Sequence, residues 1–150
     1  MCAQPQISPN GQWLAYTSNE SGRNEVYVRP YPEVDGGKWQ VSNNGGNSPL
    51  WSPDGRKLFY RNNDVVISAS VETDQVFTVE SPKILFQGTY LAANYTPGSL
   101  ELTPWDISPD GKRFLMMKEP GTGESTRGGP RRINIIVNWF EELKERVPPK

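Results

Sequence analysis

Two aspartates and an asparagine occupy the same place in a four-residue block that occurs three times in this sequence. The block is Ser-Pro-Asp-Gly or Ser-Pro-Asn-Gly, and its third residue is Asn10, Asp54 or Asp110. Repeated carboxylates can hold a cation or a polar ligand. The block is also suited to a turn, since Pro fits the first central position and Gly a left-handed one. Asn10 favours the turn, because a cation site would favour a carboxylate; we expect a hairpin connector, with a ligand or metal contact as the alternative.

Other residue types that carry chemistry are scarce. The 150 residues include no histidine and one cysteine, Cys2. The absence of histidine excludes Ser-His-Asp and Cys-His catalysis, histidine-ligated zinc and the usual near-neutral general base. No paired-carboxylate spacing and no Gly-x-Ser-x-Gly elbow is visible. We therefore expect no catalytic residue, no metal and no cofactor.

The charge and the apolar content bear on partners and compartment. The formal net charge is −1, so we expect neither nucleic acid nor a membrane as a partner. No stretch approaches the roughly 20 apolar residues that span a bilayer, and the first residues lack the regions of a signal peptide. The sequence as written is typical of a cytoplasmic protein. A periplasmic location is expected instead if it is part of a longer exported or membrane-anchored protein.

The spacing of the block predicts the architecture. Ser52 follows Ser8 by 44 residues, and Ser108 follows Ser52 by 56. A period of roughly 40 to 50 residues is that of propeller blades, each a four-stranded sheet that cannot bury its faces alone. Gly and Pro, 14 of each, suit short strands joined by turns. We predict an all-β fold of about three four-stranded antiparallel propeller blades.

Apolar and alternating runs predict the strands of each blade. Second strands are predicted around residues 14–16, 58–60 and 114–116, and third strands at 25–29, 65–69 and 133–139. Fourth strands are predicted at 38–42 and 83–87, with none in the third copy. The chain is thus expected to be a single partial propeller domain over 1–150, with blades at about 3–43, 47–88 and 105–139.

The aromatic residues are expected to form the core. A stacking platform for sugars or bases is the alternative for the five tryptophans. Four of them lie at or beside strand positions, where packing between blade faces is the better explanation. These are Trp13, Trp51, Trp105 and Trp139. Trp39 lies in a polar stretch, and its place is left open.

The end of the sequence predicts a short helix over about 139–147. The run Asn138-Trp139-Phe140-Glu141 matches a capping box, and Trp139 and Leu143 are four residues apart, on one helical face. We expect Trp139, Phe140 and Leu143 to be buried where the open ends of the blade stack close.

Two loops break the period and are the candidate interaction surfaces. Residues 88–104 are rich in Tyr, Asn, Gly and Pro, and residues 119–132 form a Gly-rich hairpin tip. Long loops on a rigid scaffold are where binding usually occurs, although both are also consistent with surface decoration. The arginine cluster suits a phosphate or an acidic partner, and a solvated hairpin tip explains it better. The candidate contact residues are Tyr90, Tyr95, Arg127, Arg131 and Arg132.

Two of the repeats resemble those of TolB-like propellers. The matching phrases are Leu50-Trp51-Ser52-Pro53-Asp54-Gly55-Arg56-Lys57-Leu58-Phe59-Tyr60 and Asp106-Ile107-Ser108-Pro109-Asp110-Gly111-Lys112-Arg113-Phe114-Leu115. The tail, residues 134–143, is similar to the C-terminal end of bacterial proteins in which a Ser/Thr kinase domain precedes a TolB-like propeller. The resemblance implies a propeller for protein contacts or sensing, without catalytic residues in its repeats. The sequence departs from this family in size, since such propellers usually close with six or more blades, and it carries no kinase motif.

Three blades cannot close a ring, because propellers use about four to eight. Since open blade faces are a liability for a monomer, we expect two copies to complete a six-bladed ring as a homodimer. The expected function is a non-enzymatic module that binds an unknown protein or small ligand on a propeller face. One alternative is a propeller hydrolase or lyase, or the gating domain of a prolyl-oligopeptidase-like peptidase, with carboxylates, Tyr or Arg converging on a channel. Another is a fragment of a larger propeller protein.

Overall fold

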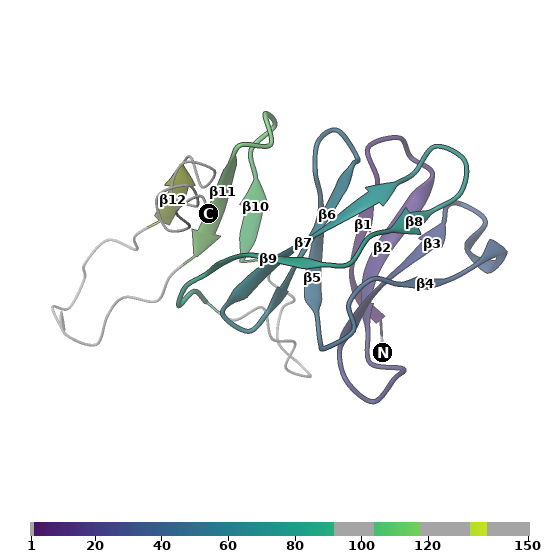
Figure 1. Ribbon diagram of the computed structural model, residues 1–150, viewed down its shortest axis with the longest axis horizontal. Coiled ribbons are helices and arrows are strands. Elements are labelled where there is room, and N and C mark those ends of the chain that lie inside the picture. The colour runs from purple at the N-terminus through teal and green to yellow at the C-terminus, as the bar shows by residue number, and fades with distance from the viewer. Residues whose placement is uncertain (1, 92–103, 118–132, 138–150) are drawn as a thin grey trace, which may run out of the picture.

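The computed structural model of the chain consists of antiparallel sheets that follow one another along the sequence (Figure 1). It describes residues 2–91, 104–117 and 133–137, and for residues 2–3 and 133–137 the backbone alone. The predicted helix over about 139–147 therefore lies outside the described residues.

Blade 1 is a four-stranded sheet in the order β1-β2-β3-β4. Its strands are β1 (Cys2–Ile7), β2 (Trp13–Ser18), β3 (Glu25–Pro30) and β4 (Trp39–Gln40), and a 3-10 helix, η1 (Val34–Gly36), precedes β4. The fourth strand is shorter than the predicted 38–42. Its ladder ends because the Ser42 hydroxyl, instead of a backbone carbonyl, accepts the Val26 amide hydrogen at 2.7 Å.

Blade 2 contains five strands, β5 (Asn47–Trp51), β6 (Lys57–Asn62), β7 (Val65–Glu72), β8 (Thr78–Val79) and β9 (Lys83–Gln87). The predicted fourth strand at 83–87 is confirmed as β9. The sequence did not predict β8, which pairs with the last two residues of β7. Because β7 is eight residues long and β9 pairs only with its first four, the end of β7 is open to a second short partner.

Blade 3 has three strands among the described residues, β10 (Trp105–Ile107), β11 (Arg113–Met117) and β12 (Ile133–Val137), in that order. β12 confirms the predicted third strand from Ile133 to Val137; the last two predicted residues lie outside the described range. The prediction that this copy has no fourth strand concerns residues after Val137, which lie outside the described range.

Two apolar cores lie between the blades. One joins blades 1 and 2 and includes Ala15, Val28, Leu58 and Tyr60. The other joins blades 2 and 3 and includes Phe59, whose ring meets the Phe114 ring edge-on at 5.0 Å between centroids. Successive residues of β6 thus serve opposite cores, as the alternation of a strand requires. Sheets packed face to face in this way are propeller blades, and the predicted all-β blade fold is confirmed.

Three tryptophans link neighbouring blades as well as filling the cores. The indole N–H of Trp13 donates to Thr73 O at 2.8 Å, that of Trp51 to Gln6 O at 3.0 Å, and that of Trp105 to Ser48 O at 3.1 Å. All three are buried, so their predicted core role is confirmed. Trp39 is partly buried and meets Trp13 edge-on, and Trp139 lies outside the described residues.

The first strands of blades 1 and 2 also meet at a shared backbone irregularity. Gln4 and Ser48 occupy equivalent positions, four residues before each turn serine, and have φ values of 57° and 51°. Each lies where the strand register shifts. The Gln4 side-chain oxygen accepts the Ser48 amide hydrogen at 2.9 Å and the Thr17 hydroxyl at 3.2 Å. The Gln4 side chain, at the register shift of β1, thus satisfies the backbone amide of Ser48, at the register shift of β5.

Removing the Phe59 ring tests the packing between blades 2 and 3. Phe59 is 2% exposed, so Phe59→Ala should lower the free energy of unfolding by about 3–5 kcal/mol through lost burial and a cavity. Urea denaturation followed by tryptophan fluorescence measures the loss. Ile84→Ala is the control, because Ile84 is 71% exposed and its truncation should cost within about 0.5 kcal/mol. Equal losses in both variants would contradict the packing.

Candidate functional site

The repeated Ser-Pro-Asp/Asn-Gly blocks join the first and second strands of each blade and use their polar side chains internally. In blade 2 the Ser52 hydroxyl donates to Asp54 Oδ1 at 2.6 Å and accepts the Lys57 amide hydrogen at 2.9 Å. Asp54 Oδ1 also accepts the Arg56 amide hydrogen at 3.1 Å. The same three bonds recur in blades 1 and 3. The prediction of a hairpin connector is confirmed.

The three turns stack on one side of the molecule, at the top of Figure 1. Their glycines, Gly11, Gly55 and Gly111, have φ values of 73°, 70° and 69°. A Cβ on Gly55 would lie 3.7 Å from Pro9 Cδ, and one on Gly111 would lie 3.4 Å from Pro53 Cδ. The proline of one turn therefore packs against the glycine of the next. We call this side, with residues 8–12, 52–56 and 108–112, the turn face.

Asn10 departs from the aspartates of the other two turns because it makes an additional contact with the next blade. Its Nδ2 is 3.3 Å from both the carbonyl oxygen and the hydroxyl of Thr73. A carboxylate has no hydrogen to donate and would face the Thr73 carbonyl oxygen. The sequence showed the substitution but carried no signal for its distant partner.

The turn aspartates are held in their charged form. The Ser52 hydroxyl, followed by the Arg56 backbone amide, lowers the pKa of Asp54. The Ser108 hydroxyl and the Lys112 amide lower the pKa of Asp110 in the same order. A carboxylate that already accepts these hydrogen bonds is a weaker base than a free one. The aspartates are thus better suited to holding the turns than to general base catalysis.

The opposite ends of the strands form a second face, which we call the linker face. It consists of residues 19–24, 43–46, 62–64 and 88–91, the turns and linkers at the ends of strands remote from the turn face. The predicted interaction loop over 88–104 begins here. Two buried charged residues, Glu25 and Arg61, hold this face together, and sequence reasoning predicted neither.

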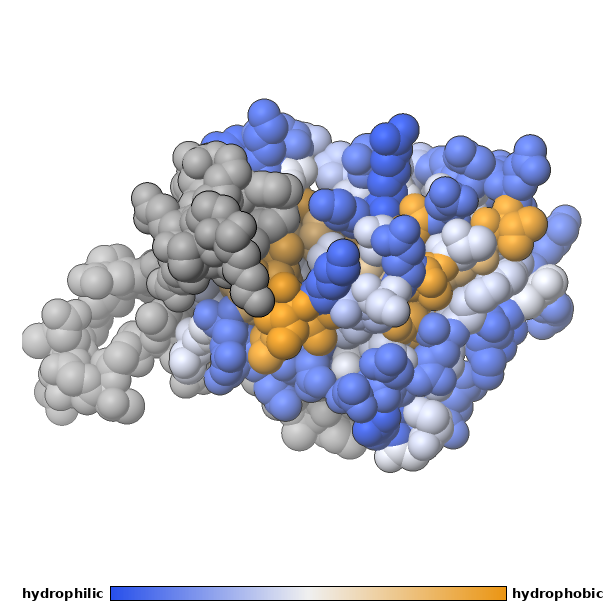
Figure 2. Space-filling view, in the orientation of Figure 1, coloured by the Kyte–Doolittle hydropathy of each residue, from blue (hydrophilic) through white to orange (hydrophobic). Residues whose placement is uncertain are grey.

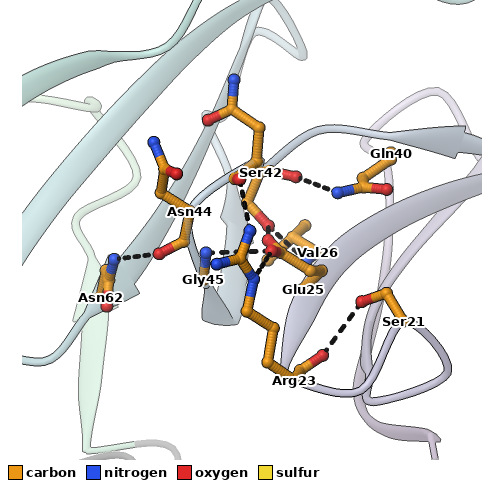
Figure 3. Close-up of polar contacts among 10 residues, drawn as sticks. Ser21, Arg23, Glu25, Val26, Gln40, Ser42, Asn44, Gly45 and Asn62 are labelled. Carbon is orange, nitrogen blue, oxygen red and sulfur yellow. Dashed lines mark hydrogen bonds and ion pairs between the residues drawn. The ribbon is translucent and has the colours of Figure 1, made fainter.

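Glu25 fixes the linker between blades 1 and 2 (Figure 3). It is fully buried, and its carboxylate accepts hydrogen bonds from Arg23 Nε at 2.6 Å, Gly45 N at 3.0 Å and the Ser42 hydroxyl. Arg23 also donates through Nη2 to Asn43 O at 2.6 Å. Ser42 and Gly45 lie 17 and 20 residues along the chain from Glu25, and a glutamate at the start of a strand gives no sign in the sequence of these two partners.

The charge of Glu25 also acts on blade 2. Burial between the blades, followed by the nearby Glu25 carboxylate, raises the pKa of Tyr60 to about 12. The phenol therefore stays neutral under all ordinary conditions and is no base or nucleophile near pH 7.

Arg61 anchors the start of the 88–104 loop. It is 1% exposed and donates through Nη1 to Leu91 O at 2.6 Å and through Nη2 to Asn63 O at 3.0 Å. Burial lowers the pKa of its guanidinium, and within the described part of the chain it makes no ion pair. The Leu91 amide in turn donates to Met117 O at 2.8 Å. The buried guanidinium of Arg61 thus ties the start of the loop to blade 2, and the Leu91 amide ties it to blade 3.

Tyr90 is the one predicted site residue that the structure describes. It is half-buried and meets the Phe86 ring edge-on at 6.3 Å. A Cβ on Gly88 would lie 2.7 Å from its Cε2 atom, so the ring packs directly over the loop backbone. The other predicted residues lie outside the described residues: Tyr95, Arg127, Arg131, Arg132, Trp139, Phe140 and Leu143.

Neither a metal centre nor a membrane-spanning helix is found among the described residues. In residues 2–91, 104–117 and 133–137, no group of three or more His, Cys, Asp or Glu side chains is arranged to hold a metal ion. No helix within those ranges combines the length and apolarity needed to cross a bilayer.

The fold and its two faces define a class of protein. This class is a stack of propeller blades that has a turn face and a linker face. No family model matches the sequence, and no curated protein matches it. Among solved structures, the chain is similar to the crystal structure of oligogalacturonate lyase from Vibrio parahaemolyticus, with a TM-score of 0.51 and 15% identity. The match covers 75% of this chain and 27% of that chain. At this identity the likeness shows the fold alone, and the chain spans about a quarter of the lyase.

The turn aspartates should make stability depend on pH in the acid range. Because hydrogen bonds lower their folded pKa below the ordinary value of 3.8, the charged forms stabilise the fold above that pH, and this stability is lost as the pH falls through the folded pKa values. The double variant Asp54→Asn/Asp110→Asn keeps Oδ1 as an acceptor but does not titrate. Its free energy of unfolding should fall less steeply below about pH 4 than that of the wild type.

Urea denaturation at a series of pH values measures this dependence. Glu72→Gln/Asp74→Asn, at two exposed positions at and after the end of β7, is the matched control for removing two negative charges. Identical pH profiles for the wild type and the double variant would show that the turn hydrogen bonds do not bias the two carboxyl groups.

Glu25→Gln should weaken the linker face. The amide places an NH2 group toward donors that now bond a carboxylate, so we expect a loss of about 2–3 kcal/mol in the free energy of unfolding. Glu20→Gln is the control, because Glu20 pairs with Lys38 at 2.7 Å with both side chains about 40% exposed. That surface pair should be worth under about 1 kcal/mol. Similar costs in chemical denaturation would contradict a special role for Glu25.

Proposed function

We propose that this chain is a non-enzymatic, TolB-like propeller module that binds a protein or a small ligand with its linker face. The observation that supports it most is the pair of buried anchors, Glu25 and Arg61, which hold the backbone of this face from two blades. Binding loops work best when a rigid scaffold positions them, since less conformational entropy is lost on binding. The 88–104 loop starts from such a position.

The chemistry of the linker face suits recognition through hydrogen bonds. Five of its asparagines are exposed: Asn19, Asn24, Asn43, Asn44 and Asn63. Asparagine side chains both donate and accept, so such a surface matches peptide groups or sugar hydroxyls rather than a strongly charged partner. Figure 2 shows a mostly hydrophilic surface, with the hydrophobic residues gathered in patches across the middle of the view.

An enzyme is the second candidate, and the lyase named above is the observation that favours it. A propeller lyase or hydrolase without histidine would need free carboxylates, Tyr or Arg in one place. Four of the described candidates have other roles: Asp54 and Asp110 hold turns, Glu25 holds a linker, and Arg61 holds a loop. We therefore propose that the chain does not cleave oligogalacturonate. Ultraviolet absorbance of the unsaturated product tests this, and its appearance with purified chain would favour the enzyme.

A segment of a larger propeller protein is the third candidate, and the 27% coverage of the lyase chain is compatible with it. Binding by the linker face does not depend on this choice, because its anchors lie within blades 1 and 2.

Replacing residues 92–103 with a Gly/Ser segment of the same length tests the proposed function. The variant should keep the wild-type melting temperature and lose the partner that the tagged wild-type chain retains, because the loop begins on the binding face. Affinity capture with identification by mass spectrometry, followed by calorimetry with the purified partner, measures this. Val34→Ser is the control, since Val34 is 37% exposed in the connection before β4, at the turn-face end of the strands. Partner binding that survives the loop replacement, or is lost with Val34→Ser, would contradict the assignment.

A further inference from the structure

The chain contains two Asn-Gly dipeptides, Asn10-Gly11 on the turn face and Asn44-Gly45 on the linker face. In this dipeptide the glycine nitrogen can attack the asparagine side-chain carbon, because glycine has no Cβ to hinder the approach. Both asparagines are exposed. Dipeptide sequence and exposure therefore predict equal reactivity, and any difference must come from how the structure holds each side chain.

The turn holds the Asn10 side chain through both of its polar atoms. Oδ1 accepts the Ser8 hydroxyl hydrogen at 2.6 Å and the Gln12 amide hydrogen at 3.2 Å. Nδ2 lies 3.3 Å from the carbonyl oxygen and from the hydroxyl of Thr73, in the next blade. The Gly11 amide in turn donates to Ser8 O at 2.8 Å. The side chain must leave these partners before its carbon can meet the Gly11 nitrogen.

The Asn44 side chain makes no hydrogen bond with the residues that the structure describes, and only its backbone is fixed (Figure 3). Asn44 O accepts a hydrogen bond from Asn62 Nδ2 at 2.8 Å. The Gly45 amide donates to Glu25 Oε1 at 3.0 Å, so the attacking nitrogen is fixed as well. The nitrogen thus has a defined position, while the carbon that it attacks lies on a side chain that is free to turn.

This difference in restraint favours ring closure at Asn44. When two reacting groups are joined by a short link, the reaction is intramolecular and little entropy is lost in bringing them together. At Asn44 no hydrogen bond to a described residue has to break before the side chain turns. At Asn10 the hydrogen bonds of the turn must break first, and leaving the Thr73 carbonyl oxygen without its donor adds a further cost.

We propose that Asn44 is a site of spontaneous deamidation in the folded chain, and that the Ser-Pro-Asn-Gly turn protects Asn10 from the same reaction. The Gly45 nitrogen bonds to Asn44 Cγ, the Cγ–Nδ2 bond breaks, and Nδ2 leaves as ammonia with the hydrogen from Gly45 N. Water then opens the cyclic imide at either carbonyl, giving aspartate or isoaspartate. The reaction consumes only water.

The modification changes the linker face at one of its anchors. While the imide exists, the Gly45 nitrogen carries no hydrogen, so Glu25 loses one of the donors that hold its buried carboxylate. Both products place a new negative charge beside this anchor, and isoaspartate also lengthens the backbone between the two residues. The site is independent of the proposed binding partner, because the reaction needs only the chain and water.

Peptide mapping of the folded and the unfolded chain tests the proposal. The chain is incubated in mildly alkaline buffer with and without urea, and trypsin then separates Asn10, in residues 1–23, from Asn44, in residues 39–56. Tandem mass spectrometry assigns the gain of about 1 Da that each deamidation produces. In the folded chain Asn44 should convert at least about tenfold faster than Asn10. In urea the two rates should converge, because the structure that distinguishes them is gone.

Two matched serine variants separate protection by the turn from a general effect on stability. Ser8→Ala frees Asn10 Oδ1 from its hydroxyl partner, so it should speed conversion at Asn10 and leave the Asn44 rate unchanged. Ser52→Ala removes the same hydroxyl from the blade 2 turn, where Asp54 stands in place of asparagine, and should change neither rate. Equal rates in the folded chain, a difference that persists in urea, or the same increase at Asn10 in both variants would each overturn the proposal.

Discussion

The structure depends on one constraint: a small antiparallel sheet with apolar side chains on both faces must cover both. β6 shows the constraint within a single strand, because Leu58 and Tyr60 serve one core and Phe59 serves the other. The three buried tryptophans reinforce each junction with an indole hydrogen bond to a carbonyl of the neighbouring blade. Stability therefore resides in the contacts between blades.

Within this stack, the turns and the buried charges have different roles. Each Ser-Pro-Asp/Asn-Gly turn satisfies its own polar groups, so it sets the register of its hairpin and makes a weak functional candidate. Glu25 and Arg61 instead bond backbone groups of linkers far along the chain. Buried charges are costly unless they are hydrogen-bonded. Glu25 accepts three hydrogen bonds, whereas Arg61 donates two through its Nη atoms and its buried Nε has no partner among the described residues. That concentration of fixed backbone is why we place binding there.

Much of the architecture was predictable from local pattern. The strands β6, β7, β9 and β11 were predicted because period-2 alternation and flanking turn residues are local properties. The predicted core role of Trp13, Trp51 and Trp105 is confirmed for the same reason. By contrast, β8 depends on the unpaired end of β7, with which it pairs. The early end of β4 depends on the Ser42 hydroxyl, which accepts the Val26 amide hydrogen. The predicted residues from Tyr95 onward stay predictions, and Tyr90 proved to pack against Phe86.

The sequence by itself determined the turns, the blade count and the apolar face of most strands, because each follows from residues a few positions apart. Only the tertiary structure decided what Glu25, Arg61 and Asn10 do, because their partners are brought close by packing between strands and blades. Asn10 and Thr73 are 63 residues apart, a separation at which no local pattern carries information. The same holds for the solvent exposure of corresponding strand residues. Leu115 looks like Phe59 in sequence, and only the structure shows that one is exposed and the other covered.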